Sequence, residues 1–400
     1  MPGATGAKDA QGPAAPCTRP PRRQGCTGRR GWATMGRVTQ MTREQIDTRI
    51  ERLVADYCSA QDGQEPPDRE QDPVRPVTSL VAHQAVASSR GGKRLRALLL
   101  LQAFESAGGA ASELSAARDI ACALEIFQTA ALVHDDIIDD SDLRRGAPSA
   151  HRALSDALHS AAQGNGLAIM LGDLLATGSV DATHRAALRT AHPDAVESAF
   201  LRMHRAVEIG QIMDVAVETL PLNDPCRLAL AAQRTYRWKT ASYTTVAPLL
   251  LGFLCAGVSP DAAQAASESI GGPLGIAFQI NDDLIDVIGT SDATGKPVGG
   301  DIREGKRTLL LADALAKADG PSRRFLVESY ESQDGARRDV QRIIGVFRST
   351  GAVEASRRRI ASLWRQARLA LDDHCAALGL DEEGRAALER QCSVFVPGMG

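Results

Sequence analysis

The 400-residue sequence has few aromatic residues, little net charge and no long hydrophobic run. The charge and the absence of a long hydrophobic run each exclude a class of protein. Aromatic residues make up 4% of the chain and the net charge is −3, without the strong basic excess of a general nucleic-acid-binding protein. The longest apolar stretch, residues 246–258, contains a proline and two glycines and is shorter than the roughly 20 residues of a membrane-spanning helix. We therefore expect no nucleic-acid partner and no transmembrane segment.

Cysteine occurs eight times but never as a CxxC pair, the spacing that marks many zinc and redox sites. The cysteines between residues 58 and 255 mostly lie among apolar residues, which is typical of buried thiols in a reducing compartment. The opening stretch also lacks the continuous apolar region of a secretory signal peptide. These features favour a cytoplasmic protein.

Charge is unevenly distributed along the chain. Residues 1–41 carry seven basic side chains and one acidic one, a net of +6, which leaves −9 for the remainder. This segment is rich in Gly, Pro, Ala and Arg and shows no hydrophobic periodicity, so we expect a disordered basic tail. A targeting segment, or an upstream start codon with a later start at Met35 or Met41, is an alternative interpretation.

Residues 42–400 show a helical hydrophobic pattern almost throughout. Thr42 and Gln45 have the spacing of a helix capping box, and Ile46 and Ile50 follow at helical intervals. Later helical segments are separated by Gly-, Pro- or polar-rich breaks, one of them expected at residues 271–273. No series of alternating residues indicates a sheet. The sequence predicts one large all-α domain, a helical bundle.

Two aspartate clusters with the spacing DDxxD each follow an apolar helical stretch. They consist of Asp135, Asp136 and Asp139, and of Asp282, Asp283 and Asp286. Side chains four residues apart lie on one face of a helix and can bind the same ion. Carboxylates suit Mg²⁺, which commonly shares its coordination with substrate phosphates. One such cluster would equally fit a solvated helix end, whereas two predict metal ions that hold a diphosphate between them.

Basic residues near these clusters provide groups that bind phosphate. Arg144 and Arg145 directly follow the first cluster, and guanidinium groups match phosphate oxygens in geometry. The segment GGKRLR contains Lys93 and Arg96, which we expect on one side of a helix that begins after the glycines.

A glycine-rich basic loop follows the second cluster at residues 295–308. It contains Lys296 and Lys306. Such a loop can close over phosphates and exclude water from the site.

Together these motifs resemble those of the trans-isoprenyl diphosphate synthases, or polyprenyl synthetases. GGKRLR is similar to the family's GGKRxRP motif, although Ala97 replaces the usual proline. HDDIIDDSDLRRG resembles the first aspartate-rich motif, with Ala147 in place of a common arginine after it, and FQINDDLID resembles the second. The resemblance extends from about residue 42 to near the C-terminus. It implies an isoprenoid synthase bundle around a central prenyl pocket, and a homodimer.

The implied reaction is the Mg²⁺-dependent head-to-tail condensation of isopentenyl diphosphate with an allylic diphosphate. The residues implied to bind Mg²⁺ and the allylic diphosphate are Asp135, Asp136, Asp139, Asp282, Asp283 and Asp286. Those implied to contact this diphosphate directly are Arg144, Lys239 and Lys296, with Lys306 in the same loop. Those implied to bind isopentenyl diphosphate are Lys93, Arg96, Gln128 and Arg145. Thr240 and Gln279 are placed to favour the allylic cation, and the released pyrophosphate is the expected base.

The helix before Asp135 is expected to form one wall of the prenyl pocket. Ala130 and Ala131 are small and leave its first turn open, whereas Phe127 lies two turns away, about 12 Å at 1.5 Å per residue. A pocket floor at Phe127 suits a product of about geranylgeranyl length. Alternatively, Phe127 packs in the core and another helix sets the floor.

Three other functions are compatible with parts of the pattern. A longer-chain polyprenyl diphosphate synthase for quinone side chains would differ mainly in its pocket. A class I terpene cyclase would not need Lys93 and Arg96 and usually lacks a second full DDxxD. A non-catalytic partner subunit should have eroded aspartate motifs. Because both motifs are intact, the sequence favours an enzyme.

Overall fold

The computed structural model describes residues 41–59, 73–289, 298–332 and 338–398. The expected tail, apart from Met41, and the expected phosphate ligand Lys296 lie outside these ranges. In chain order the helices and the short hairpin are α1 (Arg43–Ser59), α2 (Arg75–Ser89), α3 (Leu95–Ser106), α4 (Leu114–Ile138), β1 (Leu143–Arg144), β2 (Ala147–Pro148), α5 (Ala150–Leu158), α6 (Ala161–Ala187), α7 (Pro193–Val217), α8 (Pro225–Thr235), the π-helix η2 (Tyr236–Val246), α9 (Ala247–Cys255), α10 (Pro260–Ile288), α12 (Gly300–Glu304), α13 (Leu309–Lys317), α14 (Gly320–Glu331), α15 (Val340–Ser349), α16 (Ala352–Leu378) and α17 (Glu382–Ser393).

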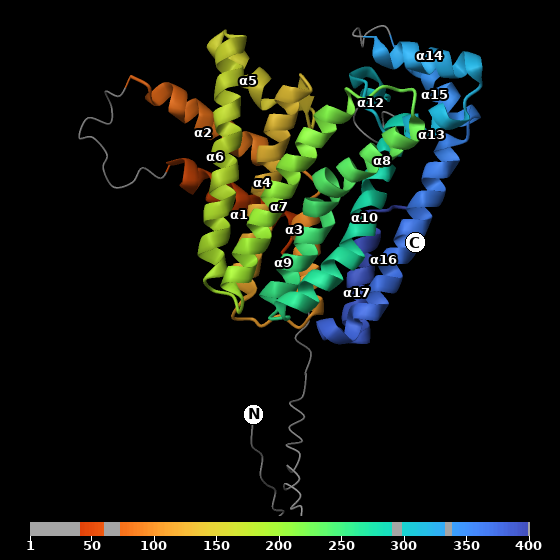
Figure 1. The fold of residues 1–400 in the computed structure, drawn as a ribbon. Coiled ribbons are helices and arrows are strands. Elements are labelled where there is room, and N and C mark those ends of the chain that lie inside the picture. The colour runs from red at the N-terminus through yellow and green to blue at the C-terminus, as the bar shows by residue number, and fades with distance from the viewer. Residues whose placement is uncertain (1–40, 60–72, 290–297, 333–337, 399–400) are drawn as a thin grey trace, which may run out of the picture. The chain divides into compact units, whose positions relative to one another are not determined.

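The helices form a bundle, as the hydrophobic periodicity predicted (Figure 1). The helix α4 packs along α6, and α10 packs between α16 and η2, while α7 and α3 complete the contacts with η2 and α9. Side chains from nearly all of these helices form one continuous apolar core. The bundle therefore brings together segments that are far apart in the sequence.

The capping box predicted at the start of the domain is confirmed. The amide of Thr42 donates to Gln45 Oε1 at 2.9 Å, and the amide of Gln45 donates to Thr42 Oγ1 at 3.3 Å. The next apolar residues, Ile46 and Ile50, are fully buried. Two otherwise unpaired amides are thus satisfied where α1 enters the core.

The prediction of a break between helices at residues 271–273 is wrong, because α10 continues through these residues. A Cβ atom added to Gly271 would lie 2.8 Å from the Cα atom of Val246, closer than side chains tolerate. A Cβ atom added to Gly275 would likewise lie 2.5 Å from the Cα atom of Ala241. These glycines therefore permit close packing of α10 against η2 and do not end the helix.

The π-helix η2 is eleven residues long, whereas most π-helical segments are a single turn within an α-helix. Such segments occur frequently at functional sites. A further glycine, Gly210 of α7, lies directly against the backbone at Trp238 and Lys239. Three glycines on two neighbouring helices therefore accommodate the wider helix.

The hairpin β1–β2 interrupts the helices immediately after α4. Arg144 pairs with Ala147, and Arg145 and Gly146 form the turn with positive φ angles of 54° and 79°. The tight turn directs the Arg144 side chain back toward the end of α4, where it meets Asp136.

Within the four described ranges, no helix has the length and apolar composition needed to cross a bilayer.

Candidate active site

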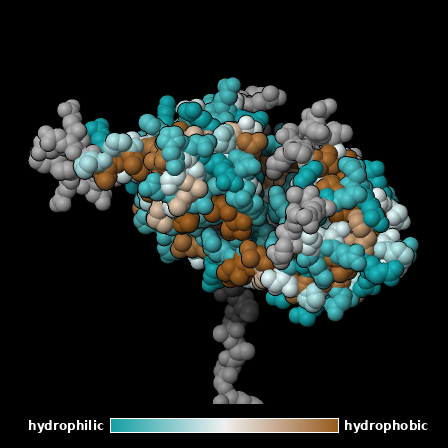
Figure 2. Space-filling view, turned by 90° about the horizontal axis from the view of Figure 1, so that it is seen from above, coloured by the Kyte–Doolittle hydropathy of each residue, from teal (hydrophilic) through white to brown (hydrophobic). Residues whose placement is uncertain are grey.

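The two predicted aspartate clusters lie at one end of the bundle, where α4 and α10 end and where α5 and α12 lie (Figure 1). Figure 2 views this end from above: hydrophilic residues cover much of it, and the surface is hollowed near the middle. Because α4 and α10 both end here, their terminal aspartates are presented at the same end.

The first aspartate cluster is surrounded by three cations from three different segments. Lys239 Nζ of η2 lies 3.0 Å from Asp135 Oδ1, and Lys306 Nζ lies 3.1 Å from Asp139 Oδ2. Arg144 Nε donates to Asp136 Oδ1 at 2.8 Å. Each of the three carboxylates therefore has its own cation.

Lys239 is held by a second carboxylate from α7. Its Nζ lies 2.5 Å from Asp214 Oδ2, and Gln211, one turn earlier on α7, donates to Asp135 Oδ1 at 3.3 Å. Gly210 lets the two backbones approach closely enough for these contacts. Asp214 thus contacts one of the site cations.

These contacts shift the pKa values of the groups involved. Burial alone would raise the pKa of Asp135, but Lys239 and Lys306 lower it below its ordinary value. Burial raises the pKa of Asp139 despite the neighbouring Lys306. Burial opposes the charge of Lys239, yet Asp135 and Asp214 raise its pKa. Lys239 therefore remains charged and can bind phosphate.

The three aspartates of the second cluster have different surroundings. Asp282 is exposed, whereas Asp283 is 4% exposed and accepts hydrogen bonds from Tyr236 Oη and from Gln279 Nε2, the latter at 2.8 Å. Asp286 accepts the backbone amides of Gly300 and Asp301 at 3.0 and 3.1 Å and so holds the start of α12.

A hydrogen-bond chain joins η2 to α10 through the predicted residues Thr240 and Gln279. Thr240 Oγ1 donates to Gln279 Oε1 at 2.7 Å, and Gln279 Nε2 donates to Asp283. Tyr236 was not identified from the sequence, yet its hydroxyl donates to Asp283 and accepts the amide of Leu309 at 3.1 Å. The feature of the sequence that could have pointed to Tyr236 is its position three residues before Lys239.

Lys306 connects the first aspartate cluster to two carboxylates of α12. Besides Asp139, its Nζ lies 2.9 Å from Glu304 Oε2 and 3.9 Å from Asp301 Oδ1. Burial opposes its charge, but the surrounding carboxylates raise its pKa well above the ordinary value. The described part of the basic loop therefore reaches the first cluster through this lysine.

The GGKRLR segment differs from the expectation in one respect. Lys93 precedes α3 and does not lie in it, because Arg94 adopts a left-handed conformation with φ of 53° and the helix begins at Leu95. Lys93 is exposed, whereas Arg96 is 7% exposed, stacks 4.0 Å over the Tyr243 ring and donates to Thr244 Oγ1 at 2.7 Å. The two basic groups thus lie on different sides of the segment.

The remaining predicted isopentenyl diphosphate ligands lie on or near α4. Gln128 is half-buried on α4. Arg145 donates to the carbonyl oxygen of Arg90 at 2.6 Å, next to the GGKRLR segment, and its guanidinium lies against Gly92. The hairpin therefore brings Arg145 to the same segment as Lys93.

The predicted pocket floor lies among three helices. Phe127 is 1% exposed, with its ring centroid 4.0 Å from that of His204 on α7 and 6.2 Å from that of Tyr243 on η2. Ala130 is buried and Ala131 is half-buried, one turn closer to Asp135. Burial lowers the pKa of His204 to about 4, so this histidine is neutral near pH 7.

The chemistry of the carboxylates fits magnesium. Asp135 and Asp139 lie four residues apart and supply hard oxygen donors at the end of α4. In the described ranges, no three Asp, Glu, His or Cys side chains form a group that could hold a metal ion, and Lys239, Lys306 and Arg144 contact the oxygens of the first cluster. Metal binding would therefore require these cations to exchange partners.

The comparisons with known proteins agree with the geometry. The sequence profile described as polyprenyl synthetase matches residues 79–347. The chain is 32% identical over 286 residues to the short chain isoprenyl diphosphate synthase of Methanothermobacter thermautotrophicus, which covers 70% of this chain and 80% of that protein. It is 30% identical over 272 residues to the octaprenyl diphosphate synthase of Escherichia coli, covering 68% and 76% of the two chains.

A solved structure shows the same fold. The geranylgeranyl pyrophosphate synthase from Corynebacterium glutamicum, complexed with isoprenyl diphosphate and magnesium, superimposes with a TM-score of 0.72 at 29% identity. The match covers 89% of this chain and 99% of that one. The fold, the two aspartate clusters and the extent of the sequence match lead to one conclusion: the chain belongs to the polyprenyl synthetase family, whose members are prenyltransferases.

Proposed function

We propose that this prenyltransferase condenses isopentenyl diphosphate head-to-tail with an allylic diphosphate in a Mg²⁺-dependent reaction. The observation that carries the proposal is the set of alternating charges at the end of α4. Asp135 and Asp139 are each paired with a lysine from a distant segment, Lys239 and Lys306. This arrangement matches a Mg²⁺–diphosphate complex, in which cations contact phosphate and carboxylates contact metal.

The ligands proposed for Mg²⁺ are Asp135, Asp136, Asp139, Asp282, Asp283 and Asp286. When bound, the metal neutralises the allylic diphosphate and stabilises it as a leaving group. Within this set, Asp282 is exposed and therefore accessible to a metal ion. Asp283 and Asp286 accept hydrogen bonds that fix the end of α10 and the start of α12.

The chain's own residues then assist the reaction in defined ways. Lys239, Lys306 and Arg144 can transfer from carboxylates to diphosphate oxygens and stabilise the charge that develops as the allylic C–O bond breaks. Thr240 directly follows Lys239, and its hydroxyl contacts the side-chain amide of Gln279, which lies beside Asp283. The dipoles of these two groups favour the allylic cation. The isopentenyl double bond then forms the new C–C bond, and the departing pyrophosphate takes the proton that is lost.

Isopentenyl diphosphate is proposed to bind beside the GGKRLR segment. Lys93 is exposed there, and Arg145 reaches the same segment from the hairpin. Arg96 and Gln128 complete the proposed ligand set from the inner side. The expected contribution of Lys296 to the allylic diphosphate stays a prediction.

We propose geranylgeranyl diphosphate as the product. Phe127 supports this length because its ring lies two turns from Asp135 and is backed by His204 and Tyr243. A longer-chain product for quinone side chains is the second candidate, since an octaprenyl diphosphate synthase is among the relatives.

A homodimer is the proposed assembly, and the cytoplasm the proposed location. The exposed apolar residues of the adjacent helices α6 and α7 support the dimer, namely Ile169, Met170, Leu201, Ile212 and Val215. Light scattering coupled to size-exclusion chromatography should give twice the chain mass. A monomer at micromolar concentration would contradict the dimer.

The activity is tested by incubating the protein with Mg²⁺, isopentenyl diphosphate and each allylic starter from dimethylallyl to geranylgeranyl diphosphate. Elongated products should form with at least one starter, should end mainly at the twenty-carbon length, and should disappear when EDTA is added. A control with Asp194→Asn, an exposed residue in the first turn of α7, should retain activity. No elongation with any starter would refute the proposed function.

A further inference from the structure

The N-terminal helix α1 contacts the segment that carries Lys93, although α1 precedes residue 79, where the match to the family profile begins. Arg43 Nε of α1 donates to the carbonyl oxygen of Gly92 at 2.7 Å. One turn later, Asp47 Oδ1 accepts a hydrogen bond from Arg94 Nε at 2.6 Å. Two residues on one face of α1 thus hold the residues on both sides of Lys93.

Arg94 is the central residue of this contact. Its side chain has 0% exposure, and its NH2 group donates to the carbonyl oxygen of Ser89 at 2.6 Å. Its NH1 group lies 3.5 Å from Glu125 Oε2 of α4. Two carboxylates from different helices, Asp47 and Glu125, therefore fix one buried guanidinium.

The backbone of Arg94 explains why the guanidinium must be fixed. Its φ of 53° is a left-handed conformation that is unfavourable for a residue with a side chain. Such a conformation persists only where the surroundings determine it. Here it ends the loop before α3 and leaves Lys93 exposed while Arg96 points into the protein.

We infer that Asp47 is a positioning residue for isopentenyl diphosphate: through Arg94 it holds the turn that presents Lys93 to the diphosphate. Asp47 itself does not contact the substrate. The inference rests on the proposed function, because it assigns Lys93 to that substrate. Under this inference α1, an N-terminal helix that lies outside the profile match, helps to set the affinity for isopentenyl diphosphate.

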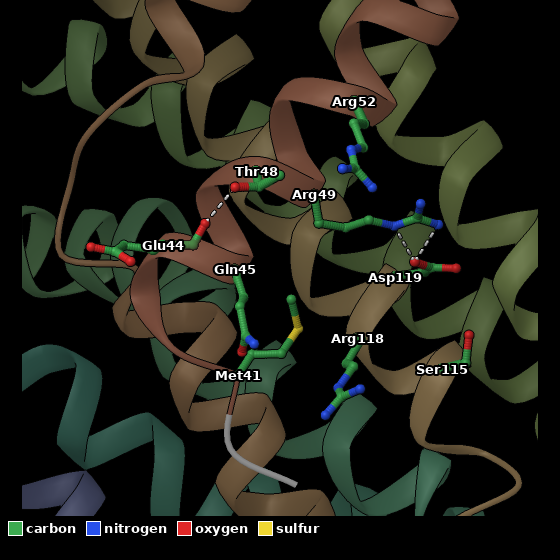
Figure 3. Close-up of a pocket in the computed structure, with 9 residues that line it drawn as sticks. All are labelled: Met41, Glu44, Gln45, Thr48, Arg49, Arg52, Ser115, Arg118 and Asp119. Atoms are coloured by element: carbon green, nitrogen blue, oxygen red, sulfur yellow. Dashed lines mark hydrogen bonds and ion pairs between the residues drawn. The ribbon is translucent and has the colours of Figure 1, made fainter. Parts of the chain in front are cut away.

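A matched control is available on the same helix. Arg49 of α1 pairs with Asp119 of α4 at 2.8 Å, as Figure 3 shows, and this ion pair has no contact with the Lys93 segment among the described residues. It borders a cavity of about 630 Å³ lined by α1 and α4, so water can solvate either group when the other is removed. Asp119 also keeps a second partner, Arg189, at 2.7 Å.

The experiment compares Asp47→Asn, Asp47→Glu and Arg49→Gln with the unmodified full chain. Binding of isopentenyl diphosphate alone is measured by isothermal titration calorimetry, and KM is measured for each substrate. Asp47→Asn should weaken isopentenyl diphosphate binding and raise its KM about tenfold, which corresponds to about 1.4 kcal/mol. The KM for the allylic diphosphate should change less than about twofold. Asp47→Glu should recover most of the affinity, and Arg49→Gln should behave as the unmodified chain.

A second variant keeps the test valid if Asp47→Asn unfolds. Arg43→Gln removes the contact with the Gly92 carbonyl from an exposed position and should also raise the KM for isopentenyl diphosphate selectively. Equal effects of Asp47→Asn and Arg49→Gln, or equal changes in both KM values, would overturn the inference. If the unmodified chain binds isopentenyl diphosphate but elongates no starter, the proposed reaction fails while the binding data still decide the role of Asp47.

Discussion

Replacement of Gly210 by alanine should disable the enzyme without unfolding it. A Cβ atom at this position would lie 2.5 Å from Lys239 Cα and 2.6 Å from the carbonyl carbon of Trp238, both backbone atoms of η2. Ordinary contact begins near 3.4 Å, and the amide nitrogen of Lys239 would lie closer still, so η2 must move away from α7 by at least about 0.9 Å. Because Lys239 Nζ contacts Asp135 and Asp214 at 3.0 and 2.5 Å, such a movement displaces the lysine from the site.

The expected size follows from two general effects. A displacement of about 1 Å at a reacting centre can reduce the rate about a hundredfold. Overpacking at a buried position costs about 1–3 kcal/mol, which a chain of this size should tolerate. We therefore expect kcat/KM to fall by about two orders of magnitude, with a circular dichroism spectrum at 25 °C close to that of the unmodified protein.

Gly345→Ala is the matched control for this substitution. Gly345 lies on the exposed side of α15, and a Cβ atom there would meet nothing within 4 Å. Alanine is favoured over glycine in a helix interior by about 0.5–1 kcal/mol, so the control should be fully active and slightly more stable to heat. An unchanged kcat/KM for folded Gly210→Ala would refute the argument that this close contact positions Lys239.

Three further predictions concern the site and the pocket. Asp135→Ala and Asp282→Ala should each remove most activity in a product assay while circular dichroism stays unchanged, since both lie in the last two turns of their helices and neither is part of the apolar core; global unfolding would instead assign them structural roles. Ala131→Phe should shorten the product and Phe127→Ala should lengthen it, and chromatography that shows neither change would contradict the proposed floor. Burial lowers the pKa of His204 to about 4, so only the unfolded chain gains this proton between pH 6.5 and pH 4. The free energy of unfolding should therefore decrease as the pH is lowered from 6.5 to 4, and it should decrease less in His204→Phe. If urea titrations give the two proteins the same dependence of unfolding free energy on pH, the histidine is not buried and neutral.

The features predicted well from the sequence are those that depend on local spacing. The capping box at Thr42 and Gln45 requires only neighbouring residues, and the four-residue interval between Asp135 and Asp139 determines their common helix face. The all-helical fold likewise follows from periodicity within each segment.

The features that the sequence did not reveal depend on packing between helices. The glycines at 271 and 272 suggested a break, but Gly271 lies against η2, a contact between residues distant in sequence. The position of Lys93 depends on Arg94, whose left-handed turn is held by carboxylates 47 and 31 positions away along the chain. The separate surroundings of Asp282 and Asp283 likewise depend on Tyr236, which comes from another helix.

The glycines around η2 also determine where the enzyme tolerates sequence change. Because Gly210, Gly271 and Gly275 meet the backbone of η2, the space that Lys239 needs is specified by α7 and α10 and not by the side chains of η2 itself. Exposed η2 positions such as Arg237 should therefore accept many substitutions, whereas the neighbouring helices should accept almost none at these three positions. A library that varies each helix separately would show this asymmetry, and enzyme redesign at this site should vary η2 while leaving its glycine supports intact.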